Sequence, residues 1–165
     1  MENDKLKLNY QRYDLVNLIN ELIEVMAAKA EERNLILVTQ INQGSMPFVG
    51  DQTIIKRIIL NLLSNAIKFT HSGSVTVTVD CDDMYRFVIK IKDTGIGIDP
   101  VNHASIFEPF YRIASADSAK YSGIGLGLSN VKLMLNKIGG EILLVSAIGL
   151  GSEFIIYLPN GEFTS

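Results

Sequence analysis

Two asparagines and a lysine form the set of residues with the clearest chemical meaning. Asn61, Asn65 and Lys68 are spaced i, i+4 and i+7, so they share one stripe if residues 51–69 form a helix. Asn is a mediocre helix former, so two in mid-helix need a reason. Amide oxygens suit Mg²⁺ bound together with phosphates, and a lysine supplies positive charge for those phosphates. An ordinary solvated helix face is the alternative, and the stripe alone leaves both open.

Two glycine-rich motifs follow the stripe. In DTGIGID, residues 93–99, Asp93 ends an alternating run, where a carboxylate can accept a hydrogen bond from an amine such as that of adenine. Gly95 and Gly97 allow backbone to approach a ligand closely. In GIGLGL, residues 123–128, free N–H groups at the start of a helix attract phosphate. The alternatives are a glycine turn after a strand and a flexible loop that enters a helix.

The segment between the two glycine motifs lacks a clear period and contains IFEPFYR at residues 106–112. A loop of that length in a compact domain is usually functional or mobile, so we expect residues 99–122 to be a mobile lid without nucleotide. Its aromatic residues are also explained by a small satellite core. The basic residues of this segment are Arg112 and Lys120, and both are candidates for contacts with an anion.

Hydrophobic periodicity predicts the elements that must position these residues. The fold class is α/β, and the economical architecture places helices over one face of a mixed sheet. Residues 42–47 are expected to form a loop, and residues 82–83 a hairpin turn. The predicted helices span 14–33, 51–69 and 125–138, and the predicted strands span 6–14, 35–41, 75–79, 85–92, 141–147 and 152–158.

Composition limits the classes of function. The chain has 165 residues, enough for one domain, whose core we place at about residues 14–159. The net charge of −3 offers no basic field for nucleic acid or acidic lipid, so neither is an expected partner. No stretch is apolar for long enough to cross a bilayer, so this chain is not expected to be membrane-inserted. Cys81, the single cysteine, is expected to be a buried thiol.

The order of these motifs resembles the ATP-binding catalytic domain of two-component sensor histidine kinases, which has the Bergerat or GHKL fold. The resemblance covers nearly the whole chain from about Asp14 and includes the closing GSEFIIYLP pattern. Four motifs match the boxes of this family: NLLSNAIKFT at 61–70 the N box, DTGIGID at 93–99 the first glycine box, FEPF at 107–110 the F box and GIGLGL at 123–128 the second glycine box.

The resemblance implies a two-layer α/β sandwich, with a mixed, mostly antiparallel sheet of about five strands and three helices on one face. It implies ATP and Mg²⁺ as ligands, with Asn61, Lys68 and Arg112 as catalytic residues. In the family, the roles implied are as follows. Mg²⁺ would be held by Asn65 and Asn61, and phosphates would be reached by Lys68 and Arg112. The adenine pocket would be formed by Asp93, Gly95 and Gly97. The lid beside the phosphates would include Gly123, Gly125, Gly127 and Leu128, and it would be anchored by Phe107 and Phe110.

The implied reaction moves the γ-phosphoryl group of ATP to a histidine on a separate dimerisation and phosphoacceptor domain. Relatives that hydrolyse ATP place a glutamate base where this chain has Asn61, which cannot act as that base. His71 and His103 lack the surroundings of a phosphoacceptor, and both are expected to be surface residues. The alternatives are an anti-sigma-type serine kinase and a nucleotide-sensing module without transfer activity.

The resemblance also implies the setting of the parent protein. We expect the phosphoryl group to pass from the parent kinase to a response-regulator receiver domain. The isolated chain is expected to be a monomer and the parent a homodimer. The catalytic part is expected in the cytoplasm, where ATP is supplied, and a membrane-anchored parent is compatible with this location.

Overall fold

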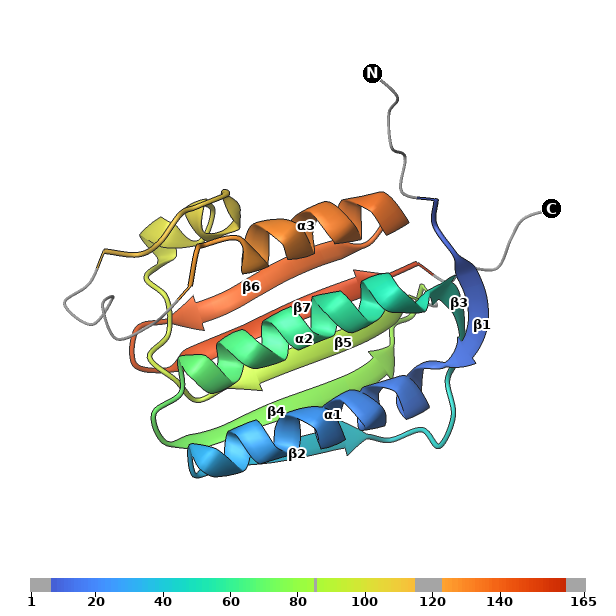
Figure 1. Ribbon diagram of the computed structural model, residues 1–165, viewed down its shortest axis with the longest axis horizontal. Helices are drawn as coiled ribbons and strands as arrows, with labels where there is room; N and C mark the ends of the chain where they lie inside the picture. The colour runs from blue at the N-terminus through green and yellow to red at the C-terminus, as the bar shows by residue number, and fades with distance from the viewer. Residues whose placement is uncertain (1–6, 85, 115–122, 160–165) are drawn as a thin grey trace, which may run out of the picture.

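The computed structural model describes residues 7–84, 86–114 and 123–159. Within this part of the chain, three α-helices lie over one face of a five-stranded sheet, and a short two-stranded ribbon crosses one end (Figure 1). This is the predicted two-layer α/β arrangement.

The sheet has the strand order β2-β4-β5-β7-β6. β2 and β4 are parallel, and every other neighbouring pair is antiparallel, so the sheet is mixed and mostly antiparallel as predicted. All five strands were predicted from the sequence, β4 and β5 from their alternation. Their bounds are β2 (Leu35–Ile41), β4 (Gly73–Cys81), β5 (Phe87–Asp93), β6 (Glu141–Ala147) and β7 (Gly151–Leu158).

The helices are α1 (Leu15–Glu32), α2 (Gln52–Lys68) and α3 (Gly127–Ile138), and two short 3₁₀ turns, η1 (Pro100–Asn102) and η2 (Ser105–Phe107), precede α3. Asp14 caps α1 by accepting from two backbone N–H groups, and Asp51 caps α2 by accepting from Ile54 N. The third helix begins two residues later than Gly125, where it was predicted, because Gly125 has a positive φ of 79° and lies outside the helix.

The predicted loop at residues 42–47 is confirmed for residues 42–46, but the strand that follows it was not predicted. Pro47 belongs to a strand, β3 (Pro47–Asp51), which pairs antiparallel with β1 (Tyr10–Asp14). The sequence pattern did not show β3 because the strand is short and carries proline and glycine, both of which are depleted in strands. Its partner is distant in the chain, so no local hairpin signal exists.

Apolar side chains of the sheet and of all three helices form one core. On the inner face of the sheet, Val77, Ile91, Phe154 and Leu144 stand opposite one another across four strands. α2 lies over the middle of the sheet (Figure 1). Because each fully buried Leu or Ile is worth about 1.5–3 kcal/mol, this packing sets the rotation of α2. Fully buried residues on α2 are Ile55, Ile58, Ile59, Leu62, Leu63 and Ile67.

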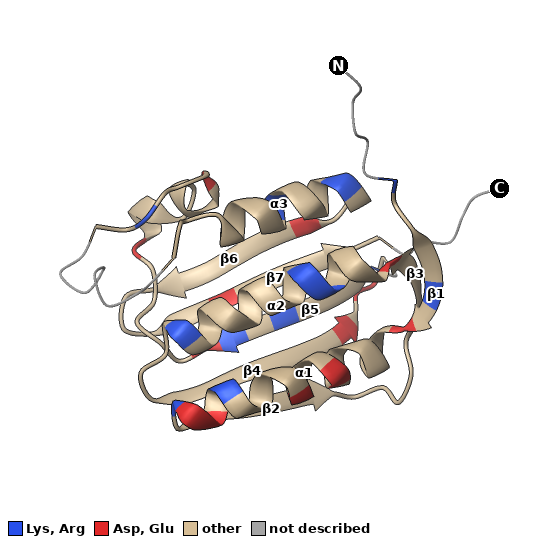
Figure 2. Ribbon diagram, in the orientation of Figure 1, with Lys and Arg blue, Asp and Glu red and all other residues tan. Residues whose placement is uncertain are grey.

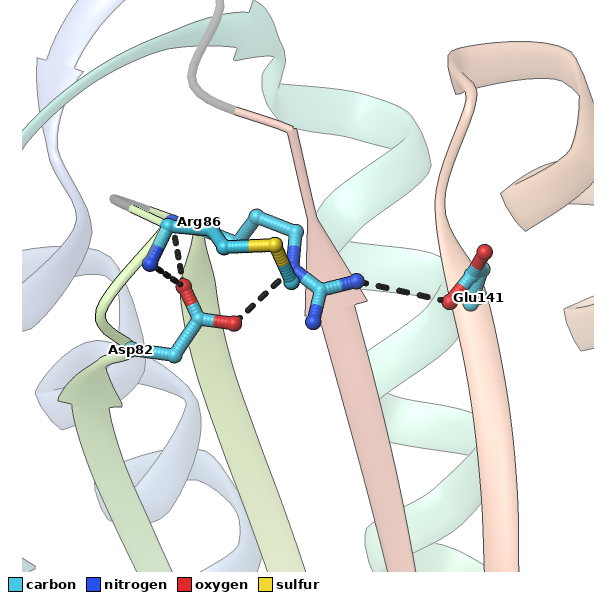
Figure 3. Close-up of polar contacts among 4 residues, drawn as sticks. Asp82, Arg86 and Glu141 are labelled. Carbon is cyan, nitrogen blue, oxygen red and sulfur yellow. Dashed lines mark hydrogen bonds and ion pairs between the residues drawn. The ribbon is translucent and has the colours of Figure 1, made fainter.

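A polar clamp closes the β4–β5 hairpin at the end of the sheet opposite Asp93 (Figure 3). The Arg86 backbone N and Nε each donate to the Asp82 carboxylate at 2.8 Å, and Arg86 Nη1 lies 3.5 Å from Glu141. The Arg86 guanidinium also stacks 4.5 Å from the centre of the Tyr157 ring. The clamp therefore joins the predicted hairpin to β6 and β7.

Cys81 is half-buried rather than buried as predicted. It is the last residue of β4, beside the hairpin turn, so the core covers it only in part. Burial raises the pKa of this thiol, and the carboxylates of Asp82 and Asp80 raise it further.

Replacing Asp51 should destabilise the fold, because one buried carboxylate serves two segments. Its Oδ1 accepts from Ile54 N at 3.1 Å and its Oδ2 from Asn9 N at 2.8 Å. We expect Asp51→Ala to lower the free energy of unfolding by about 1–3 kcal/mol in urea denaturation. Asp51→Asn keeps one acceptor for the helix cap and should fall between wild type and alanine. An alanine variant as stable as wild type would contradict this role.

Candidate nucleotide-binding site

The polar stripe of α2 faces the start of α3. Asn61, Asn65 and Lys68 are half-buried rather than fully solvated. A side-chain carbon placed on Gly127, the first residue of α3, would lie 3.5 Å from Asn61 Oδ1 and 3.9 Å from Asn65 Nδ2. The structure therefore brings the first and second asparagines of the N-box motif to the second glycine motif, although more than 60 residues separate them in sequence.

Positive charges gather around Lys68 at the end of α2. A carbon on Gly123 would lie 3.0 Å from Lys68 Nζ, which also stands 5.0 Å from the centre of the Phe69 ring. Burial lowers the pKa of Lys68, and the positive charges of Arg112 and Lys29 lower it further. Cations that disfavour one another in this way favour an anion among them.

The first turn of α3 offers backbone N–H groups beside the same asparagines. Within the described residues, no side chain caps this helix, whose N-cap is Leu126. Unpaired N–H groups and the helix dipole together attract anions at such a position. The Leu128 side chain packs against the core, so any contact of Leu128 with a ligand would come from its backbone.

Asp93 lies at the end of β5, on the inner face of the sheet, with only 4% of its surface exposed. Its Oδ1 accepts from Gly95 N at 2.8 Å and from Ser152 N at 3.3 Å. Among the described residues, no donor is recorded for its second oxygen. Burial raises the pKa of Asp93 against the opposing effect of these two hydrogen bonds. A carboxylate with one oxygen held by backbone and the other available is suited to accept from an amine.

The loop after Asp93 is wedged between α2 and the β6–β7 turn, which explains its two glycines. A side-chain carbon on Gly95 would lie 2.3 Å from Phe69 O, and one on Gly97, which has φ of 70°, would lie 1.9 Å from Ala147 O. Ile96 N donates to Phe69 O at 3.1 Å. The loop that begins directly after Asp93 thus contacts the C-terminal end of α2.

Two serines beneath this loop were missed as site residues in the sequence analysis. Ser152 and Ser146 stand opposite each other and continue the row of Asp93 across β7 and β6. Their hydroxyl groups lie 2.8 Å apart, and Ser146 Oγ accepts from Ile98 N. The signal was available, because each serine occupies an inward position of its strand where an apolar residue is expected.

The F-box residues divide into one half-buried and one exposed aromatic. Phe107 packs edge-on against Phe154, with ring centres 6.4 Å apart, and Lys132 lies over its ring. The Phe110 side chain is 68% exposed at φ of 64°, and the backbone of this residue is held by Phe110 N, which donates to Gly125 O at 2.9 Å. The roles of Phe107 and Phe110 as lid anchors stay predictions.

Residues 99–114 form a folded segment in the structure. Asp99 caps η1, and Tyr111 Oη donates to Asn102 Oδ1 at 2.7 Å. His103 was expected to be a surface residue but is half-buried, with Nε2 3.1 Å from Ile98 O. Arg112 is exposed and near enough to lower the pKa of Lys68. Lys120 and the rest of residues 115–122 lie outside the described residues, and the mobile lid stays a prediction.

Comparison with known families decides the identity of this arrangement. The profile described as "Histidine kinase-, DNA gyrase B-, and HSP90-like ATPase" matches residues 50–162, which include every motif above. The chain belongs to this family. Its relatives among curated proteins place it with the catalytic ATPase domains of sensor histidine kinases in two-component signalling.

One relative is the autoinducer 2 sensor kinase/phosphatase LuxQ of Vibrio cholerae, which is 35% identical over 163 residues. That match covers 96% of this chain but 19% of LuxQ, so the chain spans about a fifth of that relative. Full-length ShkA, solved in complex with AMPPNP, has a TM-score of 0.82 and 29% identity over 93% of this chain and 31% of ShkA. ATP binding is thus implied for this histidine kinase domain.

The catalytic domain of histidine kinase ThkA supports the fold. It has a TM-score of 0.80 at 24% identity, and the match covers 92% of this chain and 96% of that domain. This similarity confirms the predicted fold, and the family profile and the curated relatives confirm the predicted family and enzyme class. None of the described helices combines the length and apolar character that a bilayer crossing needs.

Neutralising Asp93 should stabilise the ligand-free protein at neutral pH. Because its folded-state pKa is raised, the native state binds the proton more tightly than the unfolded state. Stability is therefore lost as pH rises from the ordinary aspartate pKa through the raised folded value. We expect the free energy of unfolding of Asp93→Asn, measured by urea denaturation, to equal that of wild type at the acid end of this window. As the pH rises through the window, the variant should become increasingly more stable than wild type. A variant whose relative stability falls as pH rises would contradict this.

Proposed function

We propose that this domain binds Mg-ATP and transfers its γ-phosphoryl group to a histidine on a separate dimerisation and phosphoacceptor domain. The observation that carries the proposal is the junction of Ile96 N with Phe69 O. It joins a buried carboxylate suited to adenine with a stripe of amides and positive charge suited to phosphates. Membership of the family and the AMPPNP complex of ShkA support the same assignment.

In this proposal the adenine amine donates to Asp93, and Gly95 and Gly97 leave room for the ring. Removing this carboxylate would leave the amine without its charged acceptor, a loss of about 1.5–3 kcal/mol. The triphosphate lies toward Lys68 and the first turn of α3. Arg112 is the second cation near Lys68 and is proposed to contact the terminal phosphates.

Mg²⁺ fits the donor set of the site. The described residues contain no group of three His, Cys, Asp or Glu side chains able to hold a metal alone. Mg²⁺ is often held by few protein ligands together with water and phosphate oxygens, so the carboxamides of Asn65 and Asn61 are suitable partners. When bound there, the metal would neutralise charge on the phosphates.

Asn61 favours transfer to histidine over hydrolysis. An amide cannot remove a proton from water or from a serine hydroxyl. A neutral imidazole needs no such base, because its unprotonated nitrogen already carries the attacking electron pair. The bond between the γ-phosphorus and its bridging oxygen breaks, a phosphorus–nitrogen bond forms, and ADP leaves. Positioning and charge neutralisation, the tasks of Lys68 and Asn65, are the main requirements of such a transfer.

The site also has an open side from which an acceptor can approach. Asn61 lines a surface cavity of about 260 Å³ between α2 and α3, together with Arg57, Asn130, Leu133 and Met134. The acceptor histidine is proposed to belong to a different domain of a longer, homodimeric parent kinase. A receiver domain would accept the phosphoryl group next. The isolated domain is proposed to be a monomer acting in the cytoplasm.

The direct test is phosphoryl transfer in trans. The domain is incubated with γ-labelled ATP, Mg²⁺ and a purified dimerisation and phosphoacceptor domain of a sensor kinase. We expect label on the acceptor domain that is labile in acid and stable in base, as a phosphohistidine is. Acid-stable label on a serine would favour the anti-sigma-type kinase instead. ATP binding without transfer to any acceptor tested would favour the nucleotide-sensing module.

The matched variants are Asn65→Ala and Asn17→Ala, the second on the exposed surface of α1. Loss of a metal-site residue should lower labelling by about tenfold or more. The melting temperature without nucleotide should change little, because Asn65 lies on the polar stripe. Asn17→Ala should label like wild type. A fall in melting temperature that accounts for the lost activity would assign Asn65 a structural role.

A further inference from the structure

The C-terminal turns of α1 and α2 lie side by side, and basic residues mark both (Figure 2). Lys29 Nζ donates to Ser64 Oγ at 3.1 Å, and Arg33 Nη2 donates to Lys68 O at 3.2 Å. Ser64 directly precedes Asn65 and stands one turn before Lys68. Two basic side chains, one in the last turn of α1 and one at its C-cap, therefore reach the part of α2 that carries the polar stripe.

The two contacts have different consequences. Arg33 satisfies a backbone carbonyl at the end of α2, where helix carbonyls lack intrahelical partners, so it positions the last turn. Lys29 contacts a neutral hydroxyl, which leaves its charge uncompensated by that contact. Glu31 and Glu32 follow on α1, but the ion pairs recorded among the described residues do not include Lys29.

Lys29 is close enough for its charge to act on the site. Residues at i and i+4 of a helix, such as Ser64 and Lys68, have Cβ atoms about 5–6 Å apart. Lys29, which is hydrogen-bonded to Ser64, therefore lies about one helical turn from the point where Lys68 leaves the helix, a length comparable to the screening length of about 8 Å at physiological ionic strength. After burial and Arg112, the charge of Lys29 is the third cause that lowers the pKa of Lys68.

We propose that Lys29 is a further phosphate-recognition residue, which extends the positive charge around Lys68 onto α1 and favours nucleotides with more phosphates. This inference rests on the proposed function, because it assumes that the triphosphate lies at Lys68. The competing explanation is that Lys29 only tethers α1 to α2 through Ser64. Loss of a tether would change the stability of the fold and would lower the affinities for adenosine, ADP and ATP equally. Loss of a charge would lower the affinity more for ligands that carry more phosphates.

The test compares affinities for a non-hydrolysable ATP analogue, ADP and adenosine, with Mg²⁺, in Lys29→Met, Lys29→Arg and Ser64→Ala. From the Coulomb energy of a screened charge, we expect Lys29→Met to weaken ATP-analogue binding about three- to tenfold. The loss should be smaller for ADP, absent for adenosine and reduced at high salt. Lys29→Arg, which keeps the charge, and Ser64→Ala, which removes only the tether, should both bind the ATP analogue nearly as wild type does.

The control is Lys56→Met. Lys56 also lies on α2 facing α1, 3.9 Å from Glu21, but it is 12 residues before Lys68, about 18 Å along the helix and beyond the screening length. Its affinities should not change. If Lys29→Met loses affinity equally for adenosine and the ATP analogue, or loses none, the inference about Lys29 is overturned. The proposed function still stands in that case, provided that wild type binds the analogue and Asn65→Ala binds it weakly. Wild type that fails to bind the analogue would overturn the proposed function and this inference together.

Discussion

The carbonyl of Phe69 is the point on which the geometry of the site depends. Phe69 ends α2, and its oxygen accepts from Ile96 N in the loop that follows Asp93. Gly95 passes so close to this oxygen that a side chain there would force the two segments apart. One backbone contact therefore sets how far the buried carboxylate lies from the polar stripe, and the nucleotide must span that separation.

The two sides of this junction are held by opposite kinds of burial. α2 is positioned by apolar side chains, since Ile59, Leu62 and Ile67 are fully buried between the helix and the sheet. Asp93 is positioned at a cost, because burial disfavours its charge. Ser152 N and Gly95 N offset part of that cost through one oxygen. A buried charge held in this way is typical of a binding site, where stability is lower than a neutral residue would allow.

Much of the fold and the polar stripe of α2 could be predicted from the sequence, because they follow from residues within single elements. Alternation in β4 and β5, the Asp51 cap and the spacing of Asn61, Asn65 and Lys68 are readable within one element. The rest depends on contacts between distant segments. β3 exists through its pairing with β1, and the placement of Ser146 and Ser152 follows from their register beside Asp93. The backbone bond of Phe110 to Gly125 also joins two segments that are distant in the sequence. The reach of Lys29 to α2 likewise appears only once two helices are packed together.

Asp93 and the α2 stripe are proposed to belong to one nucleotide site. Calorimetric titration of AMPPNP with Mg²⁺ into wild type and Asp93→Asn tests this proposal most directly. We expect one binding site in the wild-type domain and an affinity at least about tenfold weaker in Asp93→Asn, because the substitution removes a charged hydrogen-bond acceptor. Equal binding by both proteins would contradict the proposal and would place the adenine elsewhere on the domain.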